Sequence, residues 1–257
     1  MNGLVPVGAY MTVHLLVNSS LVNGPGAFQN NVNQIHSLGA FLPAVEWAFI
    51  FLPIIFHAVF GVWIIRSGKS NVDRYRYTNN FRYAMQRWTG VIAIIFIFFH
   101  VFHLHGWFHA DFWLKMVEPW GMASFRPYNA ASTLATALTG FLWPIFYLIG
   151  VLACVYHFAN GVWTAGITWG VWVSPRSQQW ATYACTAGGI GLALVGMTAL
   201  YAATQTDIAE AKRVEDNMYN ARVTTGEIKP DEHKRSHGSE SVKVAEGEAK
   251  LKDAASK

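Results

Sequence analysis

The chain of 257 residues is too apolar for an ordinary soluble domain, because 53% of it is hydrophobic and only 13% is charged. A typical soluble domain carries about 25% charged residues. The net charge of +4 does not indicate nucleic-acid binding, since the basic residues of the first 205 positions gather mainly in one loop. Cys154 and Cys185 lie in apolar stretches and are expected to be small core residues, not a disulfide or a zinc site.

Acidic residues divide the chain into two parts. Residues 1–205 contain four of them, and residues 206–257 contain the other eleven together with ten basic residues. This contrast predicts a membrane domain over 1–205 and a polar C-terminal tail over 206–257. Because the tail has little apolar content, it is expected to be disordered.

Five apolar stretches are candidates to cross a bilayer, which takes about 20 apolar residues per helix. In chain order they cover residues 4–17 (or 4–22), 41–65, 89–105, 138–173 and 183–203. No basic residue precedes the first stretch, so it is expected to be a retained helix and not a signal peptide. The predicted fold class is therefore an all-α membrane protein, a bundle of five transmembrane helices.

Basic residues are distributed unequally between the loops. Six lie between positions 66 and 87, and Arg176 lies in the next loop on the same side, whereas the loops on the other side hold only Lys115 and Arg126. The positive-inside rule therefore places the loop 66–87 in the cytoplasm. The N-terminus is then expected in the cytoplasm and the tail on the other side of the membrane.

Four histidines lie within the predicted spans, each on a different helix: His14, His57, His100 and His157. An imidazole in hydrocarbon costs free energy unless it has a partner, so each is a candidate functional residue. A lone one would more often be a satisfied core residue or an interhelical hydrogen bond. Glu46 is the only carboxylate in or near a span, which argues against a proton relay. Four imidazoles can instead supply both axial ligands of two haems.

Depth in the membrane decides the expected pairing. His14 and His100 each lie three or four residues from a polar position, about 5–10 Å from the outer polar edge at 1.5 Å per residue. His57 lies about 14 Å from the cytoplasmic end of its span, and His157 also belongs to the inner half. We therefore expect His57 to pair with His157 near the cytoplasm and His14 to pair with His100 further out.

A repeated motif supports the inner pair. His57 and His157 both begin the pattern H-x-x-x-G-V-W, which places Gly61 and Gly161 one turn along the same helix face. A glycine there leaves room for a flat macrocycle beside the imidazole. Close helix packing through small residues is the alternative explanation.

Haems with both axial positions filled leave no open site for oxygen or substrate, so such a protein would carry electrons. Two alternatives stay open. One is the di-haem cytochrome b subunit of a hydrogenase or formate dehydrogenase. The other is a haem-free membrane anchor or transporter whose histidines form hydrogen bonds between helices.

With these residues in place, the chain resembles the cytochrome b558 subunit of succinate dehydrogenase, the single-polypeptide di-haem anchor of menaquinone-linked succinate:quinone oxidoreductases. The resemblance covers most of residues 4–200. The matching stretches are Val5-Pro-Val-Gly to His14 with Leu-Leu-Val-Asn18, Phe51-Leu-Pro-Ile-Ile-Phe-His57-Ala-Val-Phe-Gly61-Val, Gln86-Arg87-Trp-Thr89-Gly90 to His100, Gly150-Val-Leu to His157-Phe-Ala-Asn160-Gly161, and Thr168-Trp-Gly to Ser174-Pro-Arg176-Ser-Gln178.

The resemblance implies a bacterial cytoplasmic (inner) membrane protein with a proximal haem b on His57 and His157 and a distal haem b on His14 and His100. It implies a flavoprotein and an iron–sulfur subunit docked on the cytoplasmic face. Electrons would pass from the iron–sulfur subunit through the proximal and then the distal haem to menaquinone. The chain itself would carry no residue that acts on succinate. Arg87, in the basic loop, is the candidate for contact with a haem propionate.

The quinone site is expected on the outer side, beside the distal haem. Its polar candidates are His36, Glu46, His103 and His105, and Glu46 is preferred because it is the one acid near a span. Val155 stands where di-haem fumarate reductase relatives can carry a glutamate, so a proton route through that position is not supported. The remaining histidines are not expected to be ligands: His36, His103, His105, His109, His233 and His237.

Overall fold

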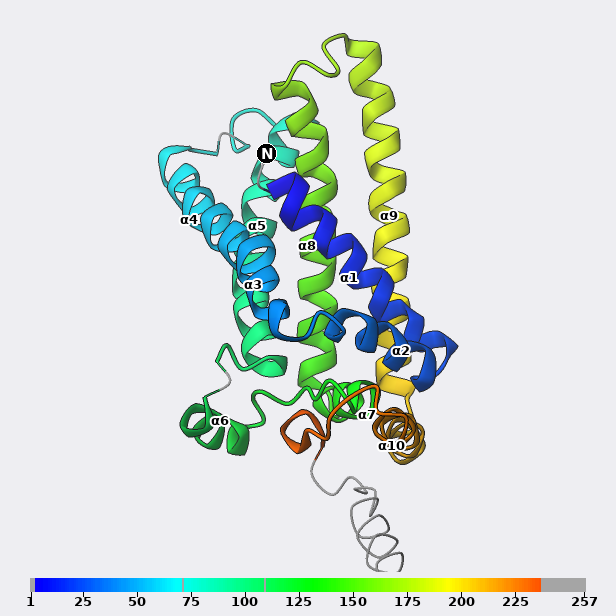
Figure 1. Cartoon of the computed structure of the whole chain (residues 1–257). Coiled ribbons are helices and arrows are strands. Elements are labelled where there is room, and N and C mark those ends of the chain that lie inside the picture. The colour runs from blue at the N-terminus through cyan, green and yellow to red at the C-terminus, as the bar shows by residue number, and fades with distance from the viewer. Residues whose placement is uncertain (1–2, 71, 109, 237–257) are drawn as a thin grey trace, which may run out of the picture.

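The computed structural model describes residues 3–70, 72–108 and 110–236, and its regular structure there is entirely helical (Figure 1). Five helices are long and apolar enough to cross a membrane, which confirms the predicted number of spans. They cover Gly3–Asn23, Gly39–Ser67, Thr78–Leu104, Leu142–Thr168 and Pro175–Gln205. His109 and His237, which are not expected to be ligands, lie outside the described residues.

The first two spans are interrupted helices. The first combines η1 (Gly3–Gly8), α1 (Ala9–Ser19) and η2 (Ser20–Asn23), and the second combines η3 (Gly39–Phe41), α3 (Leu42–Glu46), η4 (Trp47–Phe51) and α4 (Leu52–Ser67). Proline explains several of these breaks, because it removes a backbone donor and fits best in the first turn of a helix. Pro6 lies in η1, and Pro43 and Pro53 lie in the first turns of α3 and α4.

The other three spans are single helices: α5 (Thr78–Leu104), α8 (Leu142–Thr168) and α9 (Pro175–Gln205). Both α5 and α9 pack along α8, and α1 packs against α9 (Figure 1). Helix α4 stands at the edge of the bundle, and none of its side chains is buried. Its apolar, unburied surface suits a helix that faces lipid.

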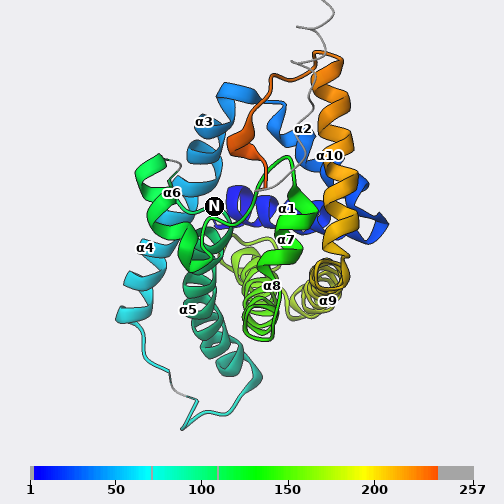
Figure 2. The same cartoon turned by 90° about the horizontal axis from the view of Figure 1, so that it is seen from below.

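The short elements gather at one end of the bundle, which we call the capped end. They are α2 (Pro25–His36), α6 (Asp111–Val117), η5 (Glu118–Trp120), α7 (Ala130–Ala137), α10 (Ile208–Thr224) and η6 (Glu232–Lys234). Figure 2 shows α2, α7 and α10 side by side across this end. The opposite end, which we call the basic end, carries the loop from α4 to α5 and the turn from α8 to α9.

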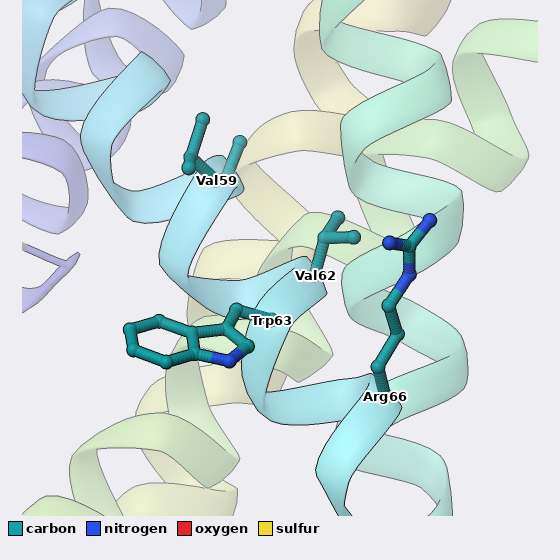
Figure 3. A pocket seen from close by; sticks show the side chains of 5 residues that line it. Val59, Val62, Trp63 and Arg66 are labelled. Carbon is teal, nitrogen blue, oxygen red and sulfur yellow. The ribbon is translucent and has the colours of Figure 1, made fainter.

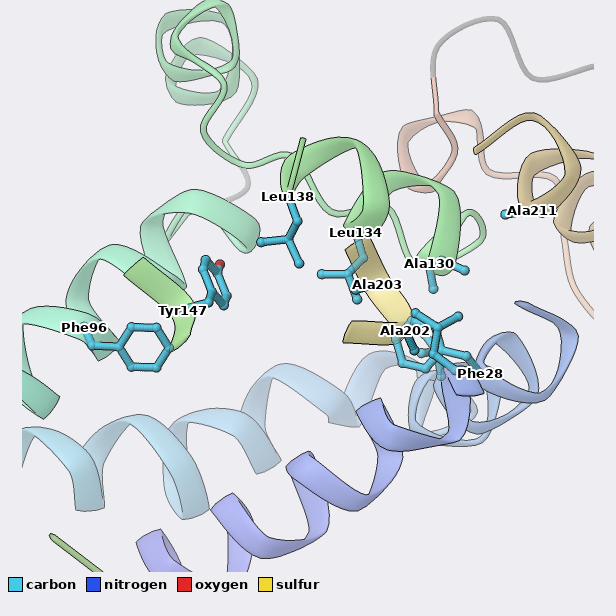
Figure 4. Packing of buried hydrophobic residues seen from close by; sticks show 12 residues of the cluster. Phe28, Phe96, Ala130, Leu134, Leu138, Tyr147, Ala202, Ala203 and Ala211 are labelled. Atoms are coloured by element: carbon cyan, nitrogen blue, oxygen red, sulfur yellow. The ribbon is translucent and has the colours of Figure 1, made fainter. Parts of the chain in front are cut away.

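The buried core lies toward the capped end and joins both kinds of element. Phe96 of α5 and Tyr147 of α8 belong to the same cluster as Phe28 of α2, Leu134 of α7 and Ala202 of α9 (Figure 4). Seven of the eight residues of α7 are buried, because this short helix lies between the other capping elements and the ends of the spans.

Three boundaries differ from the predicted spans for local reasons. α5 begins eleven residues before position 89, because the polar residues of its first turns find partners on α8 and α9. α8 lies between Gly140 and Gly170, both with positive φ, which a glycine adopts without steric cost. α9 begins at Pro175, where Ser174 and Ser177 form a capping box.

The expectation of a disordered tail from residue 206 onward is wrong for residues 208–236. Helix α10 begins at Ile208, after the side chain of Asp207 accepts hydrogen bonds from the backbone of Ala209 and Glu210 at 2.9 and 3.0 Å. It packs against α2 and α7. The remainder of the predicted tail, 237–257, lies outside the described residues.

Polar contacts explain this order. The first backbone donors of α7 have no partner within their own helix. Gln29 of α2 accepts from the backbone of Ala130 at 3.0 Å, and Glu215 of α10 accepts from the backbone of Ala131 and Ser132. Arg235 then forms an ion pair with Asp216 at 3.0 Å. The capping elements are therefore held by buried hydrogen bonds and an ion pair in addition to the apolar core that they share with the bundle.

Candidate functional site: two histidine pairs

The first pair lies toward the capped end, between α1 and α5. The ring centroids of His14 and His100 are 5.8 Å apart, with an interplanar angle of 78°. Tyr10 stacks on His14 at 5.5 Å, and the Asn18 amide donates to the backbone carbonyl of His14 at 2.8 Å. We call this the capped-end pair.

The second pair lies toward the basic end, between α4 and α8. The ring centroids of His57 and His157 are 6.0 Å apart, with an interplanar angle of 73°. The structure thus brings together the same two pairs that depth along the helices predicts. We call this one the basic-end pair.

The spacing in both pairs fits a metal ion held between two imidazoles. A metal–imidazole bond is about 2.0–2.1 Å long and the centroid lies about 1 Å behind the nitrogen, so two axial ligands place their centroids about 6 Å apart. Among the described residues, no group of three or more His, Cys, Asp or Glu could hold a metal ion. A two-ligand site requires the other ligands from elsewhere, as the ring of a haem supplies them.

His157 has its ring orientation fixed by the backbone of α5. Its Nδ1 lies 3.0 Å from the carbonyl oxygen of Gln86, which can only accept, so Nδ1 carries the proton. With Nδ1 protonated, Nε2 carries the lone pair, which is the usual arrangement for a histidine ligand. In this structure Nε2 lies 3.5 Å from the side-chain nitrogen of Gln86. The Gln86 side chain also donates to the backbone carbonyl of His157 at 3.1 Å.

The same polar contacts continue toward the basic end. Asn160 donates to the side chain of Gln86 at 2.8 Å and accepts from Nε of Arg82 at 2.9 Å. The Arg82 guanidinium lies 3.7 Å from the ring centroid of Trp163 and donates to Thr182 at 3.3 Å. These contacts tie α5 to α8 and α9, and they hold Gln86 in place beside His157.

Glycines lie beside the basic-end pair in two different ways. A Cβ built on Gly61 would meet nothing within 4 Å, and one on Gly161 would meet only the Gln86 amide nitrogen, at 3.4 Å. Gly61 is therefore not explained by close helix packing, whereas Gly161 lies at van der Waals distance from a side chain of α5. Gly90 is different, because a Cβ there would stand 2.9 Å from Cε1 of His157. Its lack of a side chain lets α5 approach the imidazole.

Arg87 is a half-buried cation at the basic end. Its Nη1 is buried and has no hydrogen-bond partner among the described residues, while its guanidinium lies 3.9 Å from the ring centroid of Tyr83. A Cβ on Gly68 would clash with the same guanidinium. An unpaired buried donor is costly, so this site suits an anionic group such as a carboxylate.

A shallow pocket of about 470 Å³ runs along α4 just beyond His57. It is lined by Ala58, Val59, Val62, Trp63 and Arg66. Figure 3 shows Val62 and Arg66 extending to one side of α4 and Trp63 to the other. The pocket lining is apolar except for Arg66, which lies toward the basic end of the bundle. Such a lining suits a flat apolar group that carries a carboxylate.

Glu46 and His36, two of the quinone candidates, lie in different surroundings. Glu46 ends α3 and lies within electrostatic range of Tyr10, the residue that stacks on His14. His36 ends α2, which packs against η2, α7 and α10 and belongs to the capping elements. Glu46 is therefore placed toward the capped-end pair.

Three residues beside the pairs were not among the predicted site residues: Gln86, Gly90 and Tyr147. Gln86 and Gly90 are four residues apart on α5, a spacing that places them on one helix face. That spacing is a usable signal, although it does not say which helix the face meets. The hydroxyl of Tyr147 lies near His100, and nothing in its local sequence indicates that contact.

Five spans and two intramembrane histidine pairs define a multi-pass helical membrane protein of the kind that can hold a prosthetic group within its bundle. The chain is 36% identical to the succinate dehydrogenase cytochrome b558 subunit of Bacillus subtilis (strain 168) over 201 residues, which are 78% of this chain and 91% of that protein. No protein-family model and no solved structure matches the chain. The chain belongs to the family of succinate dehydrogenase cytochrome b558 subunits.

Proposed function

We propose that the chain is the membrane-anchor cytochrome b subunit of a succinate:quinone oxidoreductase. His57 and His157 would be the axial ligands of a proximal haem b, and His14 and His100 those of a distal haem b. The observation that carries the proposal is the ring spacing of 6.0 and 5.8 Å in two histidine pairs, each formed by two different spans. The relationship to a cytochrome b558 subunit supports it. Membership in this family implies haem, although the number of haems and their ligands belong to the proposal.

When bound, haem with two axial imidazoles supplies one-electron redox chemistry and no open coordination position. The residues of the chain position and insulate it. The Gln86 carbonyl fixes the protonation of His157, and Gly61 and Gly161 leave one face of each helix open beside the ligands. Arg87 would pair with a haem carboxylate.

Family membership also implies the other succinate dehydrogenase subunits as partners. In our proposal the flavoprotein and the iron–sulfur subunit dock at the basic end, where Arg66, Arg74 and Arg76 are exposed. Electrons would enter at the basic-end pair, pass to the capped-end pair and reduce menaquinone near Glu46. The basic end and the N-terminus would then face the cytoplasm, in agreement with the positive-inside rule.

The test is the haem content of the purified complex. We expect a b-type reduced-minus-oxidised spectrum and two haems per chain. His57→Ala and His157→Ala should each remove the same haem and leave the other spectrum intact, while His14→Ala and His100→Ala should remove the second. His233→Ala, at an exposed position of η6, is the matched control and should keep both haems.

Two results would contradict the proposal. One is less than one haem per chain after careful purification, which would favour a haem-free anchor. The other is a shared phenotype of His57→Ala and His100→Ala, which would contradict the pairing. The subunits that co-purify with the chain identify the enzyme to which it belongs. A flavoprotein and an iron–sulfur subunit that oxidise succinate support the proposal, whereas a hydrogenase or formate dehydrogenase would contradict it.

A further inference from the structure

The hydroxyl of Tyr147 lies between two imidazoles. Its oxygen is 3.3 Å from Nδ1 of His100 and 3.1 Å from Nδ1 of His103. Tyr147 is only 6% exposed, and its ring packs edge-on against Phe96 at a centroid distance of 5.5 Å. The hydroxyl therefore joins a candidate haem ligand to a second buried histidine that no part of the proposed function uses.

His103 is held in place by its surroundings. Its ring stacks on Trp143 at a centroid distance of 3.6 Å with an interplanar angle of 7°. His103 is only 1% exposed. The hydroxyl of Ser124 also donates to the backbone carbonyl of His103 at 2.9 Å. An imidazole fixed in this way can fix the Tyr147 hydroxyl in turn.

Ligation of iron by His100 would set the direction of these hydrogen bonds. An imidazole that binds iron through Nε2 carries its proton on Nδ1, so His100 donates to the Tyr147 oxygen. The Tyr147 hydroxyl keeps its own proton to donate, and Nδ1 of His103 lies within reach as the acceptor. Each of the three polar atoms then has a partner.

We propose that Tyr147 is a positioning residue for the distal haem site, which holds the His100 ring in its ligating orientation and lowers the reduction potential of the haem bound there. The proposal rests on His100 being a ligand. An acceptor for Nδ1–H makes an imidazole a more basic ligand, and a more basic ligand favours ferric over ferrous iron. His103 acts through Tyr147 by accepting from its hydroxyl.

The basic-end pair provides an internal comparison. There, His157 Nδ1 donates to a backbone carbonyl, the Gln86 oxygen, which a side-chain substitution does not remove. Only at the capped-end pair can the acceptor be deleted by a single isosteric change. Tyr147→Phe should therefore alter one haem and leave the other unchanged.

The experiment is a redox titration of the purified whole complex, followed at the α-band, with the electron paramagnetic resonance of the ferric haems as a second readout. For Tyr147→Phe we expect about a tenfold rise in the ratio of reduced to oxidised distal haem at fixed potential, which for one electron is about 59 mV. The g-values of the distal haem should shift as well. The proximal haem should titrate as in the wild type.

Tyr201→Phe is the matched control. It removes a hydroxyl from an exposed ring of α9 that contacts neither histidine pair, and it should leave both potentials unchanged. His103→Phe is the second variant, since it keeps a ring on Trp143 but removes the acceptor for Tyr147. It should shift the distal haem in the same direction and by less.

An unchanged distal potential in Tyr147→Phe overturns the inference, as does an equal shift in Tyr201→Phe. If Tyr147→Phe fails to retain the distal haem, the reduction potential of the distal haem in His103→Phe is the deciding measurement. An unchanged potential in His103→Phe then overturns the inference. Failure of the proposed function looks different. It would appear in the wild type as missing haem, or in His100→Ala as the retention of both haems.

Discussion

His157 is confined between the backbone of Gln86 and the bare Cα of Gly90. A Cβ at position 90 would stand 2.9 Å from Cε1 and 3.2 Å from Nδ1 of the imidazole, too close for either atom to remain in place. In Gly90→Ala we expect the ring to shift away from the Gln86 carbonyl. The proximal haem should then bind about 10–100-fold more weakly, as when the hydrogen-bonding partner of a metal ligand is lost. Haem content per chain measures it.

Gly188→Ala is the control for this prediction, because a Cβ at position 188 of α9 would meet nothing within 4 Å. It should keep both haems, and Gly90→Ala should keep the distal one. If Gly90→Ala retains two haems with unchanged spectra, the close approach of α5 to the imidazole does not position the ligand.

At this scale the sequence predicted the histidine pairs but not their neighbours. Depth along a helix is counted in residues, so His14 with His100, and His57 with His157, could be matched without knowing how the helices cross. Their role as ligands stays a prediction. The contact of Tyr147 with His100 depends on the angle and rotation of α8 against α5, and neither is encoded in the periodicity of one helix.

Helix α7 shows how a short element can be stabilised by its neighbours. Its first backbone N–H groups donate to the side chains of Gln29 of α2 and Glu215 of α10. The side chain of its own N-cap residue, Asn129, makes no capping hydrogen bond. A capping contact of this kind contributes about 0.5–2 kcal/mol. Because α7 leads directly into α8, the capping elements help to hold the end of the helix that carries Tyr147.

Glu215 makes this contact sensitive to pH. Burial raises the pKa of its carboxyl to about 7, and hydrogen bonds from Ser132 and the α7 backbone only partly oppose that shift. A raised folded-state pKa means that the stabilisation is complete below the ordinary carboxyl value and is lost as the pH rises through about 7. We expect the amide protection of α7 and α10 to fall over that interval, by at most about 3 kcal/mol. Hydrogen–deuterium exchange, corrected for intrinsic rates, measures it.

Glu215→Gln should remove this pH dependence, because the amide resembles the protonated carboxyl. Glu210→Gln is the matched control, since Glu210 lies on the exposed side of α10 and pairs with Arg213 at 2.7 Å. It should leave the profile of the wild type unchanged. A pH dependence that survives in Glu215→Gln would assign it to another group.

The order of α10 was missed because two of its four buried residues are acidic. Ala211, Glu215 and Tyr219 recur every four residues, which is the spacing of one helix face, but Glu215 and its neighbour Asp216 interrupt the apolar pattern. Composition alone therefore indicates a solvated tail. The partners that satisfy Glu215 lie more than 80 residues away in the chain, and no local pattern could indicate them.

The whole molecule is polarised between its two ends. The basic end carries a loop rich in arginine and the pair His57–His157, and the capped end carries the folded tail and the pair His14–His100. An anchor that passes electrons from one side of a membrane toward the other needs carriers at two depths. In the proposed function the two histidine pairs would place carriers at those depths, and the orientation of the bundle would decide the direction of electron transfer.

Orientation can be tested with two exposed positions, one at each end: Ser70 in the loop after α4 and Thr225 just after α10. The native Cys154 and Cys185 are first replaced by alanine, and a single cysteine is then placed at one position. Three spans lie between Ser70 and Thr225, so the two positions are on opposite sides of the membrane. With the basic end in the cytoplasm, a membrane-impermeant maleimide should label Thr225→Cys on intact cells and Ser70→Cys only after permeabilisation. Inverted vesicles should reverse the pattern. Labelling of Ser70→Cys from outside would place the basic end, and with it the proposed docking face of the iron–sulfur subunit, on the wrong side of the membrane.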